Sequence, residues 1–190
     1  MSKAIWKSKN EPDISLVENL KTKLNAPDII ARMLVQRGID SVEKVNSFFN
    51  PKVEDLYDPF LMKDMDKAIE RIQLAQDNKE GVLIFGDYDV DGTTSVALVY
   101  SFFKDKFTKI DFYIPDRYNE GYGISNQGID YAKSAGITLI IALDCGIRSI
   151  DKIEYAKSLG IDFIICDHHL PGDSIPNAVA VLDPKRNDCD

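Results

Sequence analysis

Aspartate and histidine residues that could hold divalent cations recur in three short segments of the chain. These residues are Asp87, Asp89, Asp91, Asp144, Asp167, His168 and His169. Carboxylate oxygens combined with an imidazole suit Mn²⁺ or Mg²⁺ better than the sulfur-rich ligand sets of structural zinc. Two such ions about 4 Å apart can activate water and stabilise the charge on a phosphoryl group during in-line displacement. The pattern therefore predicts phosphoester hydrolysis with two divalent cations.

Apolar runs and helical patterns alternate around these segments and must position them. The expected strands are 82–85, 110–114, 138–143, 162–166 and 178–182, and the expected helices between them are 94–103, 125–135 and 149–158. Near-continuous apolar strands that alternate with helices indicate βαβ units and a parallel sheet covered on both faces. Right-handed crossovers bring the carboxyl end of every strand to one edge, where ligands bind. The sequence thus predicts an α/β fold in which the acidic residues and both histidines converge.

The first part of the chain has a different pattern. Apolar positions at 29–34, 42–49 and 65–75 predict three short helices, the second capped by Ser41 and the third by Asp64. We see no residues there whose types would support chemistry. The expected organisation is an N-terminal helical appendage over 1–75 and a phosphoesterase domain over 76–190.

Composition limits the class of protein. The formal net charge of −8 is unlike the basic surface of a protein that coats nucleic acid, although bound cations would neutralise part of it. Three cysteines without CxxC spacing indicate neither a disulfide framework nor a zinc ribbon, and they favour a reduced, cytoplasmic protein. The apolar runs are too short to cross a bilayer, so no membrane association is expected.

Several of these residues also have ordinary structural interpretations. Asp183, beside a proline, is as typical of a turn as of a metal ligand. The segment 87–92 has calcium-loop spacing, but Leu98 stands where the twelfth-position glutamate belongs. Cys145 and Cys166 fit small core residues better than nucleophiles. Arg117, in the loop after the second expected strand, is either a phosphate contact or a solvated side chain.

Three segments of the chain resemble motifs of the DHH phosphoesterase superfamily. Residues 87–95 read Asp-Tyr-Asp-Val-Asp-Gly-Thr-Thr-Ser, residues 143–146 read Leu-Asp-Cys-Gly, and residues 166–169 read Cys-Asp-His-His. They are similar to its first three motifs, in order and each at a strand end. Within the superfamily, residues 85–92, 114–123, 167–172 and 181–186 are similar to the exonuclease branch that is specific for single-stranded DNA.

The resemblance implies 5′ to 3′ removal of nucleotides from single-stranded DNA, in DNA repair and recombination. The implied metal ligands are Asp87, Asp89, Asp91, Asp144 and His168, with two Mn²⁺ or Mg²⁺ ions as cofactors. Asp167 would orient its neighbours, His169 would contact the scissile phosphate, and Arg117 would approach the substrate's phosphate. The implied partners are single-stranded DNA, a single-strand-binding protein and a helicase, with a monomer as the full-length state.

The resemblance also implies that the chain is incomplete. Members of this branch have a fourth acidic motif and a second domain further along, so we expect a truncated fold with weak or no activity alone. The alternatives are another DHH phosphodiesterase, acting on nanoRNA or cyclic dinucleotides, a DHH pyrophosphatase, or a non-catalytic module that kept the fold. A receiver domain also places acids at strand ends, but it would leave the pair His168 and His169 unexplained.

Overall fold

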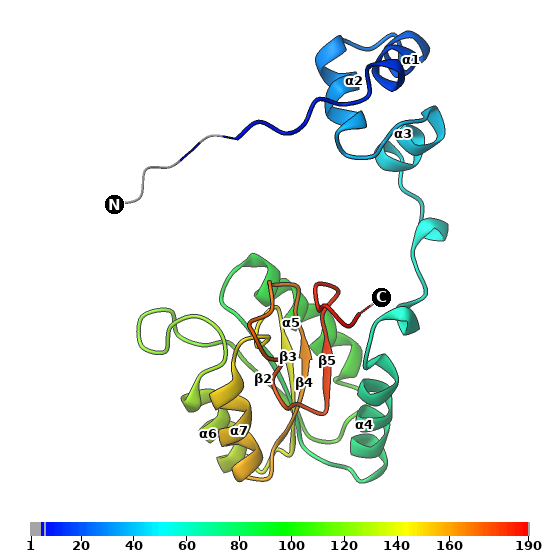
Figure 1. The fold of residues 1–190 in the computed structure, drawn as a ribbon. Coiled ribbons are helices and arrows are strands. Elements are labelled where there is room, and N and C mark those ends of the chain that lie inside the picture. Colours follow the sequence, from blue (N-terminus) through cyan, green and yellow to red (C-terminus); the bar gives the residue numbers. More distant parts are fainter. Residues whose placement is uncertain (1–4, 6, 190) are drawn as a thin grey trace. The chain divides into compact units, whose positions relative to one another are not determined.

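The structure is a computed structural model that describes residue 5 and residues 7–189. The chain divides into two compact units, Met1–Tyr57 and Asp58–Asp190 (Figure 1). Each unit contains one short 3₁₀ helix, at Val53–Asp55 in the first and at Pro59–Leu61 in the second. Within the described part of the chain, none of the helices combines the length and the apolar character needed to cross a bilayer.

The first unit is a group of three helices, α1 (Ile14–Leu24), α2 (Asp28–Val35) and α3 (Val42–Phe49). Their buried residues form a small core of Val17, Leu20, Ala31, Leu34 and Val45. The Ser41 side chain accepts a hydrogen bond from the backbone N–H of Lys44, which is the cap expected for α3. Helix α1 was not predicted, although Asp13 caps its start and Val17 and Leu20 have helical spacing.

The second unit is built on a five-stranded parallel sheet, which confirms the expected α/β fold. Its strands are β1 (Val82–Gly86), β2 (Ile110–Tyr113), β3 (Leu139–Leu143), β4 (Asp162–Cys166) and β5 (Ala180–Leu182). They lie side by side in the order β2-β1-β3-β4-β5 (Figure 1). In this register Val82 pairs with Ile110 on one side and with Leu139 on the other. All carboxyl ends therefore lie at one edge.

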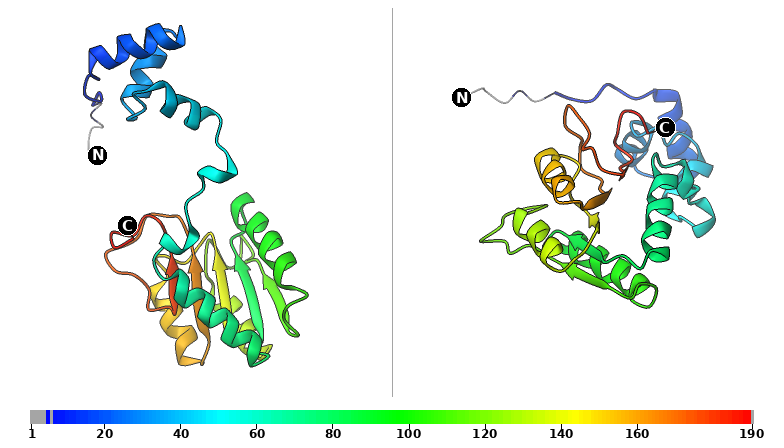
Figure 2. Two further views of the ribbon diagram at one scale, coloured as in Figure 1. Left: turned by 90° about the vertical axis from the view of Figure 1, so that its right-hand side faces the viewer. Right: turned by 90° about the horizontal axis from the view of Figure 1, so that it is seen from below.

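Helices cover both faces of the sheet because successive residues of a strand point to opposite faces. Helices α6 (Asn126–Ser134) and α7 (Ile150–Ser158) cover the face that carries Leu83 and Phe85. Helix α5 (Val90–Phe103) covers the opposite face, together with the helix that precedes β1 (Figure 2). Both faces of the central strands are consequently dry, which agrees with their near-continuous apolar sequences.

Helix α4 (Met65–Asp77) belongs with the sheet. Its residues Ala68 and Ala75 are buried in the same core as α5. The division between the compact units therefore falls before α4, whereas the sequence pattern placed a boundary after residue 75. The helical pattern of α4 resembles that of the preceding helices, but its apolar side packs against strands.

A buried arginine ties the segment after β5 to the start of α4. Arg186 Nη1 donates to Asp64 Oδ2 at 2.7 Å and to the carbonyl oxygen of Val181 at 2.6 Å. The same guanidinium donates through Nε and Nη2 to the Asp188 carboxylate. Asp64 stands at the cap position of α4, as expected, but its carboxylate serves this ion pair and not the helix N–H groups.

Candidate metal centre

The topology of the sheet opens its carboxyl edge between β1 and β3. The chain leaves β1 toward β2 on one side, and after β2 it returns to form β3 on the other side. At such a reversal the two connections diverge and leave a crevice for ligands. Asp87 follows β1 directly, and Asp144 follows β3. The loop after β4 carries Asp167, His168 and His169 to the same edge.

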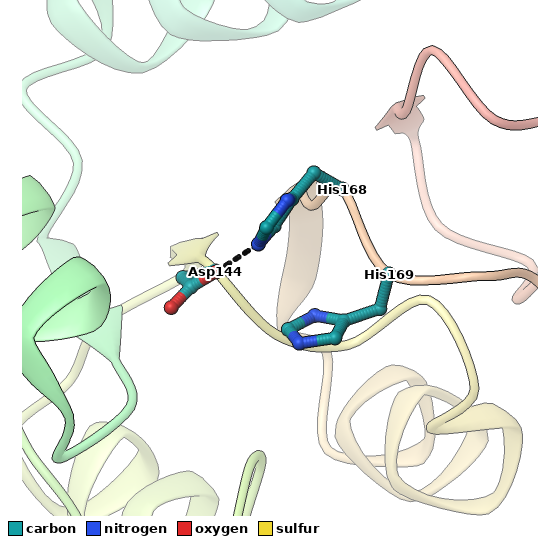
Figure 3. Close-up of side chains that lie close together, drawn as sticks. All are labelled: Asp144, His168 and His169. Carbon is teal, nitrogen blue, oxygen red and sulfur yellow. Dashed lines mark ion pairs between the residues drawn. The ribbon is translucent and has the colours of Figure 1, made fainter. Parts of the chain in front are cut away.

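Asp144, His168 and His169 form the group best placed to share a metal ion (Figure 3). One ligand atom from each lies within 4.8 Å of the others. His168 Nε2 is 3.0 Å from Asp144 Oδ1, and this pair is drawn as a dashed line in Figure 3. The backbone of Asp144 is left-handed, with φ 60°, and its N–H donates to the carbonyl oxygen of Cys166 at 2.8 Å. The backbone therefore fixes this carboxylate at the end of β3.

Asp167 holds the two histidines and the neighbouring loop. Its Oδ1 accepts hydrogen bonds from the backbone N–H groups of His168 and His169, and it lies 2.7 Å from His169 Nδ1. Its Oδ2 accepts from the Ile147 N–H at 2.9 Å. Burial alone would raise the pKa of Asp167, but these hydrogen bonds outweigh it and hold the pKa below its usual range. Asp167 is an ionised orienting group.

His169 is held between Asp167 and Tyr122. The hydrogen bond with Asp167 is the main cause that raises the pKa of His169. The other ring nitrogen, Nε2, is 3.3 Å from the hydroxyl of Tyr122. The pKa of Tyr122 is raised, first by burial and then by the charges of Asp87 and Asp144. Sequence reasoning missed this contact, because nothing in the loop 121–123 indicates which way its tyrosine points.

The three aspartates of the first segment occupy different environments. Asp87 is fully buried; its Oδ1 accepts from the Gly123 N–H at 3.3 Å, and its Oδ2 has no partner among the described residues. Asp89 caps α5 by accepting from the Gly92 N–H at 3.0 Å, which is the main cause that lowers its pKa. Asp91 is exposed on the first turn of α5. Helix α5 thus begins at Val90, earlier than expected.

These carboxylates fit divalent cations. The pKa of Asp144 is raised, first by burial and next by the nearby charge of Asp89. The unpartnered oxygen of Asp87 adds a second buried acceptor at the same edge. Buried acceptors without partners are costly, and a cation would satisfy them. Oxygen donors with imidazole nitrogen form a donor set suited to Mn²⁺ or Mg²⁺.

Arg117 lies in the exposed loop after β2. Its guanidinium carbon is 4.4 Å from the centre of the Tyr88 ring, and the Tyr88 ring meets the Tyr122 ring edge-on at 5.9 Å. A row of contacts therefore joins Arg117 to His169 through two tyrosines. The structure brings Arg117 near the edge of the site but not into the group around Asp144.

The remaining candidates are buried. Asp183, after β5, accepts from the Lys185 N–H at 2.7 Å, as a turn-forming aspartate would, while its Oδ2 has no partner among the described residues. Burial raises the pKa of Cys145 well above its usual value and that of Cys166 to about 12. Thiols that stay protonated are poor nucleophiles, so both cysteines fit the core role expected for them.

Fold and site together define a class of protein: a doubly wound α/β domain with carboxylates and imidazoles at its carboxyl edge. The DHH family, N-terminal domain, matches residues 81–190, more than half of the chain. The chain therefore belongs to the DHH family, as its motifs indicated.

Relatives with known names support this assignment. The chain is 40% identical over 188 residues to the single-stranded-DNA-specific exonuclease RecJ of Bacillus subtilis, covering 99% of this chain and 24% of the relative. It is 34% identical over 164 residues to the RecJ of Escherichia coli, covering 86% of this chain and 28% of that relative. The chain thus spans about a quarter of the length of these curated relatives.

A solved structure shares the fold. The crystal structure of exonuclease RecJ bound to manganese matches with a TM-score of 0.63 and 26% sequence identity. The match covers 70% of this chain and 34% of that one. The similarity supports the arrangement of strands and helices that positions the candidate metal centre.

Proposed function

We propose that this chain forms the metal-binding part of a manganese- or magnesium-dependent exonuclease that acts on single-stranded DNA. The observation that carries the proposal is the convergence of Asp144, His168 and His169 beside the unpartnered carboxylate oxygen of Asp87. The names of the relatives supply the substrate class. Because the chain spans about a quarter of their length, nuclease activity is proposed for a protein as long as these relatives.

The proposed ligands occupy three strand ends. Asp144 and His168 are already paired, Asp89 is close enough to raise the pKa of Asp144, and Asp87 offers a buried free oxygen. Asp91, exposed one turn into the same helix, is the fifth proposed ligand. Divalent cations supply Lewis acidity toward phosphoryl oxygens and lower the pKa of water, which carboxylates alone cannot do.

The chain's own residues would orient the phosphate. Asp167 fixes the His169 ring through Nδ1, so that Nε2 is the nitrogen available to a phosphate oxygen once Tyr122 yields. The raised pKa of His169 favours the protonated ring, which can donate a hydrogen bond to that oxygen. Arg117 is proposed as a second phosphate contact, and its stacking on Tyr88 would limit the freedom of its side chain.

We further propose 5′ to 3′ polarity, two bound ions and a role in DNA repair and recombination, with a single-strand-binding protein and a helicase as partners. These proposals rest on the family resemblance. A cytoplasmic location is proposed because the three cysteines at 145, 166 and 189 are free.

Titration of the chain with Mn²⁺ tests the proposed centre. We expect Asp144→Asn and His168→Ala each to weaken Mn²⁺ binding by about tenfold or more, as loss of a ligand does. Asp105→Asn removes an exposed carboxylate on the C-terminal side of α5 and serves as the matched control. Isothermal titration calorimetry measures the affinity, and circular dichroism checks the fold. Equal affinity in all three variants would refute the ligand assignment.

The substrate is tested separately on the full-length protein. Single-stranded DNA, duplex DNA, short RNA and cyclic dinucleotides are each incubated with Mn²⁺, and released mononucleotides are quantified. We expect mononucleotides from single-stranded DNA and loss of that activity in His168→Ala. Metal binding combined with hydrolysis of short RNA or cyclic dinucleotides alone would reassign the substrate within the family. Metal binding without any hydrolysis would favour a non-catalytic module.

A further inference from the structure

A pocket of about 720 Å³ lies beside His169, bounded by the loop after β3, the start of α7 and the loop after β4. We infer that it binds a nucleoside monophosphate, the unit that the proposed exonuclease would release. The inference rests on the proposed function, because that function makes the ligand a nucleotide. This cavity is called the α7 pocket, and its lining includes Ile124, Ile147, Arg148, Lys152, Leu170 and Lys185.

The α7 pocket adjoins the candidate metal centre. Tyr122, Asp167 and His169 belong to its lining, and His169 is also a member of the group around Asp144. A ligand in the pocket would therefore have one end at the residues proposed to hold the scissile phosphate. Its volume falls within the range of about 300–1,000 Å³ that is usual for small-molecule sites.

The walls of the α7 pocket are mostly apolar. Ile124, Ile147 and Cys145 are buried in the core, and their surfaces form the inner side of the cavity. Leu170 is exposed on the opposite loop and adds apolar surface near the opening. Tyr122 presents an aromatic ring at the end next to His169. Such walls suit a sugar and a base, and a tyrosine face can stack on any base.

Cations gather at the pocket although the protein is acidic. Arg148, Lys152 and Lys185 line it, against the carboxylates of Asp151 and Asp167. Asp167 is already paired with His169, and Lys152 is 3.5 Å from Asp151. Within the described part of the chain no ion pair engages Arg148 or Lys185, so the pocket keeps positive charge for an anion. Arg148 Nε donates to the carbonyl oxygen of Leu170 at 2.7 Å, which anchors its guanidinium at the opening.

A ligand with both an apolar body and a phosphate matches this lining. A nucleoside alone would leave the cations unused, and inorganic phosphate alone would leave the apolar wall unused. Arg117 does not line the α7 pocket, so the pocket cations are a second place for a phosphate, separate from that arginine. Guanidinium and ammonium groups bind phosphate with charge-assisted hydrogen bonds.

Nuclear magnetic resonance titration tests the inference on the ¹⁵N-labelled chain. The ligand is thymidine 5′-monophosphate, and EDTA removes divalent metal so that binding through a metal centre cannot contribute. We expect shifts of the amide signals of Gly146 and Ile147. The double variant Lys152→Gln with Lys185→Gln should bind about tenfold more weakly, because two charge-assisted contacts are lost. Both lysines are at the surface or half-buried, so the variant should fold.

The matched control removes the same charge elsewhere. Lys104→Gln with Lys106→Gln changes two exposed lysines at the C-terminal end of α5, at the opposite edge of the sheet, and should bind like the parent chain. Thymidine and inorganic phosphate are titrated in parallel, and both should bind more weakly than the monophosphate. Equal affinity in the two double variants would overturn the inference, as would absence of monophosphate binding or inorganic phosphate binding as tightly as the monophosphate.

The outcome does not depend on the metal centre. A chain that binds the monophosphate in EDTA but fails to bind Mn²⁺ would refute the proposed centre and leave the pocket assignment intact. A chain that binds Mn²⁺ but not the monophosphate would do the reverse.

Discussion

Buried carboxylates at the edge of the sheet differ in how their charge is compensated. Asp167 receives hydrogen bonds on both oxygens, from three backbone N–H groups and one imidazole. Asp87, which is fully buried, has one long hydrogen bond and one oxygen without a partner among the described residues. Asp167 is therefore satisfied by the protein itself, whereas Asp87 requires a cation or water. This difference assigns the two residues to orientation and to ligation, respectively.

Acid should weaken the ion pair between Asp64 and Arg186. Burial would raise the pKa of Asp64, but hydrogen bonds from Lys67 and Arg186 outweigh it, so the folded-state pKa lies below the ordinary value of 3.8. A depressed pKa contributes stability that is present above the ordinary value and is lost as the pH falls through the folded-state pKa. We expect Asp64→Asn to cost about 2 kcal/mol at pH 7 and less at pH 3.

Urea unfolding of the parent chain and the variant at both pH values measures this difference. Asparagine tolerates the left-handed backbone at position 64, where φ is 67°, so the substitution tests charge and not backbone strain. Lys104→Gln provides a surface change of charge as a reference. A difference in free energy of unfolding that stays constant from pH 7 to pH 3 would contradict the assignment.

Positions of chemistry were easier to predict than their partners. Asp144, His168 and His169 follow apolar strands, and the parallel topology alone brings them together. The unpartnered oxygen of Asp87 and the contact between Tyr122 and His169 depend on how loops fold back, which local sequence does not encode. The roles of the predicted ligands remain predictions that metal binding must test.

The junction of β1 with α5 is packed too closely for any side chain at Gly92. A Cβ at that position would lie 2.3 Å from the carbonyl oxygen of Asp87. We expect Gly92→Ala to destabilise the chain by about 2–3 kcal/mol and to displace the loop that carries Asp87 and Asp89. Urea unfolding measures the loss of stability, and Mn²⁺ titration measures the displacement.

Gly172→Ala serves as the control for this substitution. A Cβ at Gly172 would have its nearest neighbour at 3.9 Å, which is an ordinary contact. Its stability and Mn²⁺ affinity should match those of the parent chain. If Gly92→Ala were as stable as Gly172→Ala, the close packing of helix against strand would not be a determinant of the fold.

Strands were predicted well because each is a short apolar run between turns. Residues 162–166 have the same bounds in the sequence pattern and in β4. The start of α5 was placed too late, because the cap formed by Asp89 lies among residues that also look like metal ligands. The order of strands could not be predicted, since apolar strands have no feature that selects a neighbour, and only the shared direction followed from the βαβ pattern.

Two hydrophobic cores divide the chain and predict how it can be cut. The core of α1, α2 and α3 lies within Met1–Tyr57, and α4 belongs to the cores of the sheet. We expect residues 58–190 to unfold cooperatively in urea and to bind Mn²⁺ like the whole chain. Residues 76–190 lack most of α4 and should expose the apolar face that it covers.

Two measurements distinguish the cuts. Fluorescence of a hydrophobic dye should rise with residues 76–190 and stay low with 58–190, and the urea transition of 76–190 should be broad or absent. A cooperative transition of 76–190 would support the boundary that the sequence pattern favoured. Aggregation of residues 58–190 would show that the sheet needs the first unit.

The left-handed backbone at Asp144 limits which side chains can replace the aspartate at the end of β3. Only glycine, asparagine and aspartate enter this conformation readily, and β-branched side chains are strongly disfavoured there. Of these three, glycine has no side-chain oxygen and asparagine has no charge. Steric selection and the demand for an anionic donor thus leave a single acceptable amino acid, so mutational tolerance at this codon should be among the narrowest in the chain.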